Sequence, residues 1–132
     1  MRTFASEIIE AVKGKQIFEK LIVNNICLID EFEKEIKDRG QYISEFNTLI
    51  SHMDFFANGT TLPITKFREI KSSRTKVKHY EFKSKNLRVY AFNIPGGKMV
   101  VMGGYKNNQD ADIRTFQSIV KEYISTTNVK KL

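Results

Sequence analysis

The chain has 132 residues, which is enough for one hydrophobic core and too few for two independently stable ones. No stretch approaches the roughly 18 uninterrupted apolar residues of a membrane helix, and the first residues do not resemble a signal peptide. We therefore expect a single domain over residues 1–132, soluble, in the cytoplasm and not bound to membrane. Cys27 is the only cysteine, which excludes an internal disulfide framework, and the two histidines lie far apart. We expect no metal site and no cofactor.

Positive charge is concentrated in the middle of the chain, which has a formal net charge of +7 in total. Residues 1–65 carry a net charge of −3, residues 66–106 a net charge of +9, and the remainder +1. A basic segment of this kind favours a polyanionic partner, because displaced counterions make phosphate contacts favourable. A solvated, lysine-rich sheet surface explains the charge equally well, so charge alone leaves both interpretations open.

The elements in the first half of the chain follow from the spacing of apolar residues. Residues 3–13 have helical spacing and predict a short helix, although Lys13–Lys15 also fits a hairpin turn. A strand is predicted at Gln16–Val23. Two amphipathic helices follow, one over about Asp30–Gly40 and a stronger one over Tyr42–Ala57. They form a helical hairpin, and its apolar stripe requires a flat surface such as a sheet to cover it.

The second half of the chain reads mainly as strands. Lys66–Ser73 predicts a short irregular strand or a basic loop, and the next strands are expected at Lys76–Ser84, Leu87–Ile94 and Lys98–Tyr105. A final helix is predicted over about Asp112–Ile124. The predicted fold class is therefore α+β, with a twisted antiparallel sheet of about four strands, an N-terminal helical hairpin packed against it and a C-terminal helix.

The register of the first two of these three strands follows from side-chain alternation. If Lys85-Asn86 is a two-residue turn, Lys83 pairs with Arg88 and Glu81 pairs with Tyr90. One face is then apolar and packs on the helical hairpin, and it consists of Tyr80, Phe82, Leu87, Val89 and Ala91. The opposite face gathers His79, Glu81, Lys83, Arg88 and Tyr90.

The third strand is placed by extending the pairing across a turn at Gly96-Gly97. This register puts Tyr105 beside Arg88 and turns Met102 and Gly104 toward the helical hairpin. It also leaves an apolar end on the polar face, where we expect the C-terminal helix to pack; that end consists of Phe92, Ile94, Met99 and Val101.

The polar face is a basic, aromatic surface with one carboxylate. Arginine and lysine bind phosphate, tyrosine rings stack on unpaired bases, and Glu81 is a candidate proton acceptor. Residues predicted to bind RNA are Lys66, Arg68, Arg74, Lys76, Lys78, Lys85, Tyr90, Tyr105 and Asn107. The alternative is that Lys83 and Arg88 form a purely structural cross-strand ion-pair cluster with Glu81.

Short motifs in this region resemble a known family. The run Glu81–Lys83, the strand Leu87–Tyr90, a glycine-containing hairpin and an apolar strand ending in Gly104–Lys106 are followed by a polar connector and a helix. This order resembles the RelE/ParE superfamily of type II toxins, particularly its RelE/HigB-like branch. The likeness covers about Leu62–Ile124, with the helical hairpin in the expected place before it.

The resemblance implies a RelE-like toxin that enters the ribosomal A site and cuts mRNA without a metal, the ribose 2′-hydroxyl attacking the adjacent phosphate. A cognate antitoxin, expected to be a helix-turn-helix protein, would neutralise it. By motif position the catalytic residues would be Arg88, on the scissile phosphate, with Lys83 and Lys106. Glu81 joins them as the candidate proton acceptor of the polar face, although it and His79 stand where some members of the family carry lysines. The sequence departs from the pattern at Asn107, where a second basic residue is usual.

Two other functions remain open on the same scaffold. A toxin of the ParE kind would inhibit DNA gyrase by binding it, and the departures from the catalytic pattern are compatible with that. A non-catalytic RNA-binding module would need only the basic sheet with its tyrosines.

Overall fold

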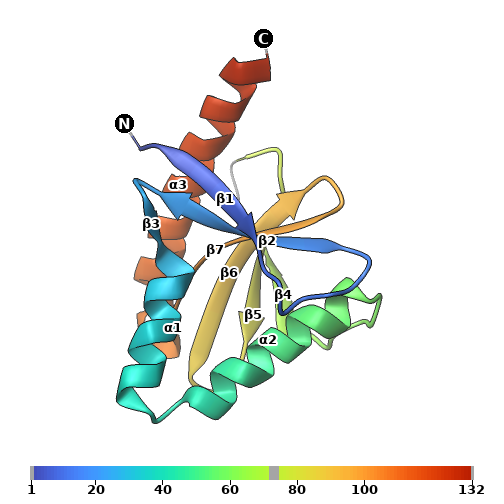
Figure 1. Ribbon diagram of the computed structural model, residues 1–132, viewed down its shortest axis with the longest axis vertical. Helices are drawn as coiled ribbons and strands as arrows, with labels where there is room; N and C mark the ends of the chain where they lie inside the picture. Colours follow the sequence, from blue (N-terminus) through green and yellow to red (C-terminus); the bar gives the residue numbers. More distant parts are fainter. Residues whose placement is uncertain (1, 72–74, 132) are drawn as a thin grey trace.

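One mixed β-sheet lies between two layers of helix (Figure 1). A computed structural model describes residues 2–71 and 75–131, with the surroundings of side chains described up to residue 126. In chain order the elements are β1 (Phe4–Ile8), β2 (Ile17–Val23), β3 (Ile26–Cys27), α1 (Leu28–Arg39), α2 (Ile43–Ala57), β4 (Phe67–Ile70), β5 (His79–Lys83), β6 (Leu87–Ile94), β7 (Gly97–Tyr105), the 3-10 turn η1 (Lys106–Asn108) and α3 (Gln109–Lys131).

The sheet is larger than predicted and contains one parallel pair. Its strand order is β1-β2-β7-β6-β5-β4, and β3 pairs with β2 beside this path. Strands β2 and β7 run parallel, whereas the other pairs are antiparallel. The α+β class is confirmed. The prediction of about four strands was too low, because β4 and the N-terminal strands also join the sheet.

The N-terminal segment differs from its prediction. Residues 3–13 were expected to form a helix, but β1 pairs with β2 from Phe4↔Val23 to Ile8↔Glu19. Its side chains after Phe4 are exposed, and Ile8 is 62% exposed, so the helical spacing of apolar residues does not correspond to a buried stripe. Backbone pairing with β2 decides the conformation here, in line with the hairpin turn that the sequence left open.

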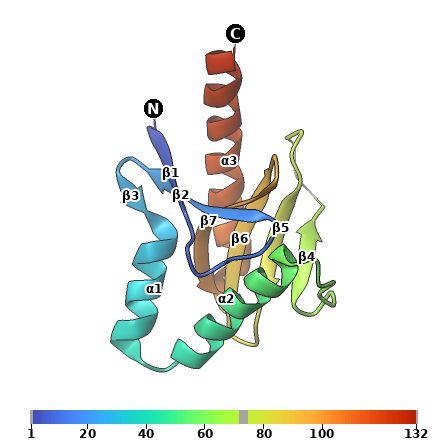
Figure 2. The same cartoon turned by 45° about the vertical axis from the view of Figure 1, so that its right-hand side comes forward.

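Helices cover both faces of the sheet, as Figures 1 and 2 show. On one face α1 and α2 bury Ile36, Leu49 and Met53 against β5, β6 and β7. On the other, α3 buries Phe116 and Val120 against the sheet. The two predicted helices on one face and the predicted packing of the C-terminal helix on the other are confirmed. Helices α1 and α2 diverge from the turn between them, however, and do not lie side by side as an antiparallel hairpin (Figure 1). Helix α3 begins earlier and ends later than predicted, and its last turns extend beyond the sheet. No helix within the described ranges is long and apolar enough to cross a membrane.

The predicted register between β5 and β6 is confirmed at every pair from His79↔Phe92 to Lys83↔Arg88. Side chains of Phe82, Leu87 and Val89 lie in the core beneath α1 and α2. Alternation and the short turn after Lys83 together were sufficient to set this register.

The predicted register between β6 and β7 is wrong. The turn is Pro95-Gly96, with Gly96 at a φ of 80°, and Ile94 pairs with Gly97. The observed pairing is therefore shifted by two residues from the predicted one. Because side chains alternate with a period of two, each residue of β7 up to Val100 still points to the face that was predicted for it. An irregularity at Tyr90/Ala91 then adds one residue to β7, so that its faces exchange beyond it.

This bulge places three residues on the opposite face from the one predicted. Met102 lies in the core beneath α3 rather than beneath the helical hairpin. Tyr105 pairs with Leu87 and packs on the α1 side, not beside Arg88. Gly104, predicted to face the helical hairpin, faces α3 instead.

Two adjacent glycines let the helices approach the sheet from opposite sides. A Cβ on Gly103 would lie 2.3 Å from the Phe32 ring of α1, and a Cβ on Gly104 would lie 2.0 Å from Asp112 Oδ2 of α3. Both distances are too short for any side chain. Gly103 therefore lets α1 pack closely on β7, and Gly104 leaves room for the Asp112 carboxylate at the start of α3.

A lysine is buried under α2. Lys98 is 5% exposed, and its ammonium donates a hydrogen bond to Asn93 Oδ1 at 2.6 Å. The ammonium also lies 4.7 Å from the ring centroid of Phe56 and 4.5 Å from that of Tyr80. Burial lowers the pKa of Lys98 to about 8.

We expect the folded protein to gain stability as the pH rises from about 8 to about 10.4, the pKa of an exposed lysine. In this window folded Lys98 has lost its proton while the unfolded chain still holds one, so a rise in pH favours the folded state. Between these two pH values, the unfolding free energy of the wild type should rise relative to that of Lys98→Met by on the order of 3 kcal/mol. Urea unfolding at a series of pH values measures this, with exposed Lys34→Met as the matched control. A pH-independent difference for Lys98→Met would contradict the assignment.

Candidate functional site

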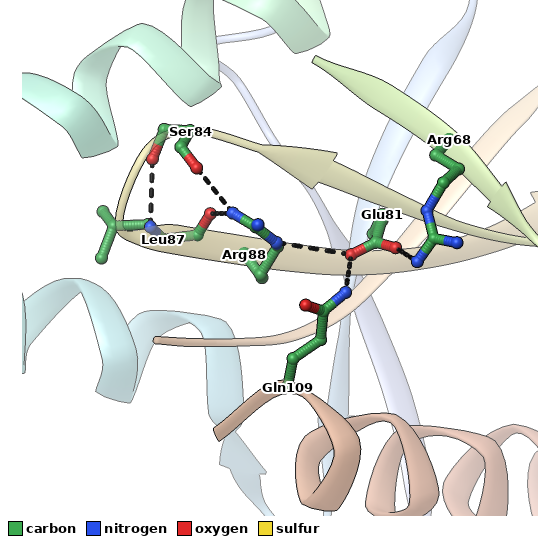
Figure 3. A network of polar contacts seen from close by, with 6 residues as sticks. All are labelled: Arg68, Glu81, Ser84, Leu87, Arg88 and Gln109. Carbon is green, nitrogen blue, oxygen red and sulfur yellow. Dashed lines mark hydrogen bonds and ion pairs between the residues drawn. The ribbon is translucent and has the colours of Figure 1, made fainter. Parts of the chain in front are cut away.

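A buried carboxylate organises the polar end of the sheet on the α3 side. Glu81, in the middle of β5, is 0% exposed. Its Oε2 accepts a hydrogen bond from Arg68 Nη2 of β4, and its Oε1 accepts one from Gln109 Nε2 at the start of α3, at 2.8 Å. Arg88 Nε of β6 lies 3.5 Å from the same Oε1. Figure 3 shows Glu81 between the two arginines, with Gln109 reaching it from α3.

Arg88 is held from both ends and is 7% exposed. Its Nη1 donates hydrogen bonds to the backbone oxygens of Ser84, at 2.6 Å, and Leu87, at 2.8 Å, while its Nε faces Glu81 (Figure 3). Its direction is therefore set by the β5–β6 turn as well as by the carboxylate.

The β5–β6 turn is itself anchored to α2 by Glu45. This carboxylate accepts hydrogen bonds from Ser84 Oγ at 2.5 Å, from the backbone N–H of Asn86 at 2.9 Å and from Asn86 Nδ2 at 2.7 Å. Partial burial acts to raise the pKa of Glu45, but these bonds outweigh it and hold the pKa below its usual value. Glu45 thus positions Arg88 indirectly, through the turn whose carbonyl groups bind the guanidinium.

Two lysines complete the group. Lys83, at the end of β5, is partly exposed, and its ammonium makes no hydrogen bond or ion pair with the residues that the structure describes. Burial lowers the pKa of Lys83; Glu81 opposes this, and the positive charges of Arg68, Arg88 and Lys106 add to it. Lys106 follows β7, is exposed, and donates its backbone N–H to Asn86 O at 2.9 Å.

We call Arg68, Lys83, Arg88, Lys106 and Glu81 the basic cluster. It contains four cations and one carboxylate, a formal charge of +3. The carboxylate lies between the two arginines and offsets one of their two charges, while the two lysines remain at the surface. Such an arrangement suits an anion such as phosphate.

The structure brings together the four residues predicted to be catalytic: Arg88, Lys83, Glu81 and Lys106. Among the residues predicted to bind RNA, Arg68 belongs to the cluster. Lys66 and Lys85 lie at the same end, since Lys66 O accepts a hydrogen bond from the backbone N–H of Lys83 at 2.8 Å and Lys85 lies in the adjacent turn. Asn107 is exposed in η1, next to Lys106.

Other predicted RNA-binding residues lie elsewhere. Tyr90 is 0% exposed and stacks on Phe116 of α3, so its ring is not available to a base. Tyr105 lies on the opposite face because of the bulge. Lys76 and Lys78 precede β5 and so lie at the end of that strand farthest from Lys83. Arg74 falls outside the described residues.

Three residues of this site were not predicted: Glu45, Ser84 and Gln109. Gln109 lies in a polar connector before α3, where the sequence gives no sign that its side chain turns inward. The available signal was the carboxylate of Glu81 itself, because a buried charge requires several partners. No group of three His, Cys, Asp or Glu side chains that could hold a metal ion occurs in the described ranges.

Glu81→Gln should destabilise the fold by about 3 kcal/mol, because it leaves Arg68 and Arg88 buried or half-buried without a counter-charge. The matched control is Glu69→Gln on β4, whose carboxylate pairs with the exposed Lys71 at 3.5 Å. We expect a change of less than about 1 kcal/mol there. Denaturant unfolding of both variants makes the comparison. Equal losses would show that Glu81 contributes no more than a surface ion pair.

Comparison with known proteins identified no relative of this chain. No protein-family model, no curated protein and no solved structure matches the chain. The chemistry proposed for the site therefore depends on its own residues and on the motif resemblance given above.

Proposed function

We propose that the protein is a toxin that binds mRNA through the basic cluster and cuts it on the ribosome, in the manner of the RelE/HigB-like toxins that its motifs resemble. The observation that carries this proposal is the position of Lys83. Its ammonium is partly exposed, unpartnered among the described residues, and surrounded by Arg68, Arg88 and Lys106. A cationic site of this kind attracts the phosphate of an RNA chain.

The cluster divides the chemistry among its members. A lysine with a lowered pKa holds a larger neutral fraction near neutral pH, so Lys83 can accept the proton of the ribose 2′-hydroxyl. The 2′-oxygen then attacks the adjacent phosphorus and the bond to the 5′-oxygen breaks, and this leaving oxygen takes a proton from water. The products are a 2′,3′-cyclic phosphate and a 5′-hydroxyl. Arg88 and Lys106 stabilise the negative charge that develops on the phosphate oxygens.

Glu81 has a different part in this scheme from the proton acceptor that the sequence suggested. It is fully buried and both of its oxygens are occupied by Arg68, Arg88 and Gln109. Its role is to hold the two arginines in place. The proposed antitoxin, a helix-turn-helix protein by the same resemblance, would act by keeping the cluster from RNA.

Expression in a bacterial host should arrest growth and produce cut mRNAs, and Lys83→Ala should lower the cutting rate by about a hundredfold or more. Mapping of RNA 5′ ends on purified ribosomes measures the cuts. Cutting should rise with pH through the lowered pKa of Lys83, because the neutral amine is the active form, and Lys83→Ala should lose that rise. Lys121→Ala, an exposed lysine of α3, is the control. Growth arrest with intact mRNA and a DNA-damage response would favour the gyrase-inhibiting alternative.

A non-catalytic RNA-binding protein is the second candidate, and the burial of Glu81 and Tyr90 favours it. Neither a carboxylate nor a tyrosine ring of the polar face is open to substrate, so binding would depend on phosphate contacts. Salt-sensitive RNA binding without cleavage or toxicity would identify this function.

Whichever of the two functions holds, replacing the Lys83 ammonium with a neutral side chain should change the salt dependence of RNA binding, because one phosphate contact is lost. For Lys83→Gln we expect the slope of log affinity against log salt concentration to become shallower by about 0.7, the value for one phosphate of single-stranded nucleic acid. Fluorescence anisotropy at several salt concentrations measures the slope, and Lys121→Gln serves as control. Identical slopes for wild type and Lys83→Gln would place the phosphate contacts elsewhere.

A further inference from the structure

A hollow of about 480 Å³ opens next to the basic cluster, where the α1–α2 turn, the β5–β6 turn and η1 meet. Its volume is in the range of about 300–1,000 Å³ that is usual for small-ligand sites. Lys106 belongs to both the hollow and the basic cluster, and its backbone is bonded to Asn86, which lines the hollow as well. A chain bound at the cluster can therefore continue into the hollow.

Two tyrosines and an arginine give the hollow planar surfaces. The rings of Tyr42 and Tyr105 have centroids 6.1 Å apart and are inclined by 56°. Arg39 Cζ lies 5.4 Å from the Tyr105 centroid, and the Tyr105 hydroxyl donates a hydrogen bond to Glu35. Tyr105 is thus fixed by its neighbours, and planar groups of this kind are the surfaces on which nucleic-acid bases stack.

Amide side chains supply donors and acceptors to the same hollow. Asn86 is oriented by Glu45, which accepts its Nδ2 hydrogen bond at 2.7 Å. Gln41 and Asn107 also line the hollow, are exposed, and make no side-chain hydrogen bond with the described residues. Amides of this kind pair with the edges of bases, whereas phosphate binding alone would require only cations.

We propose that this hollow, which we call the base pocket, binds the base of a nucleotide adjacent to the phosphate held by the basic cluster. The inference depends on the proposed binding of RNA and adds to it a site that reads bases. The base stacks against Tyr42 and the Arg39–Tyr105 pair, its edge meets the amides of Gln41 and Asn107, and Lys106 contacts the phosphate that links the two sites.

The test compares an intact RNA with one that lacks a base. The probes are a fluorescein-labelled 2′-O-methyl hexaribonucleotide, which cannot be cut because it has no free 2′-hydroxyl, and the same hexamer with one abasic position in the middle. Fluorescence anisotropy gives the affinity of each. We expect the wild type to bind the intact hexamer roughly tenfold more tightly, the contribution of about one stacked base.

Two variants of the base pocket should reduce this preference. Asn107→Ala changes an exposed side chain, and Tyr42→Leu removes a ring while keeping an apolar group. Each should weaken binding of the intact hexamer several-fold more than binding of the abasic one. Lys83→Gln should weaken both probes to the same extent, and Lys121→Gln should affect neither.

The outcomes separate the two proposals. If the wild type binds neither probe, the proposed RNA binding is wrong and the base pocket falls with it. If the wild type binds both probes equally, or if Asn107→Ala and Tyr42→Leu leave the tenfold preference intact, the basic cluster binds RNA but the base pocket does not read a base.

Discussion

The polar end of this sheet depends on one buried carboxylate. A charge without contact to water is stable only when several partners surround it, and Glu81 has Arg68, Arg88 and Gln109. These partners come from β4, β6 and the start of α3, so one side chain of β5 ties four elements together. The cluster cannot be assembled without also fixing where α3 begins.

The same carboxylate divides the cations by role. Both arginines are held by Glu81, and Arg88 is held by backbone oxygens as well, whereas Lys83 and Lys106 stay at the surface with ammonium groups that Glu81 does not bind. A site that binds a mobile polyanion benefits from this division. The arginine pair sets the geometry, and the lysine pair remains free to exchange water and counterions for phosphate.

The sequence was a good guide to some parts of the site and a poor guide to others. Alternation and a two-residue turn determined how β5 pairs with β6, and so Glu81, Lys83 and Arg88 were correctly placed together. The bulge opposite Tyr90 could not be foreseen, because the residues around it on β7 are apolar and fit either face. The burial of Tyr90 could not be predicted from the sequence either, because it depends on where α3 packs. In the structure its ring stacks on Phe116 of α3 and is not open to RNA.

The parallel pairing of β2 with β7 has a consequence for how the protein is made. Ile17 and Gly97 are partners across 80 positions of sequence, and β7 is the last strand to leave the ribosome. Until it emerges, β2 presents an unpaired edge beside helices that have no sheet to cover. Long-range pairing of this kind is slow and leaves nascent chains open to contact with one another. The step that completes the sheet is therefore the point at which misassembly is most likely during synthesis.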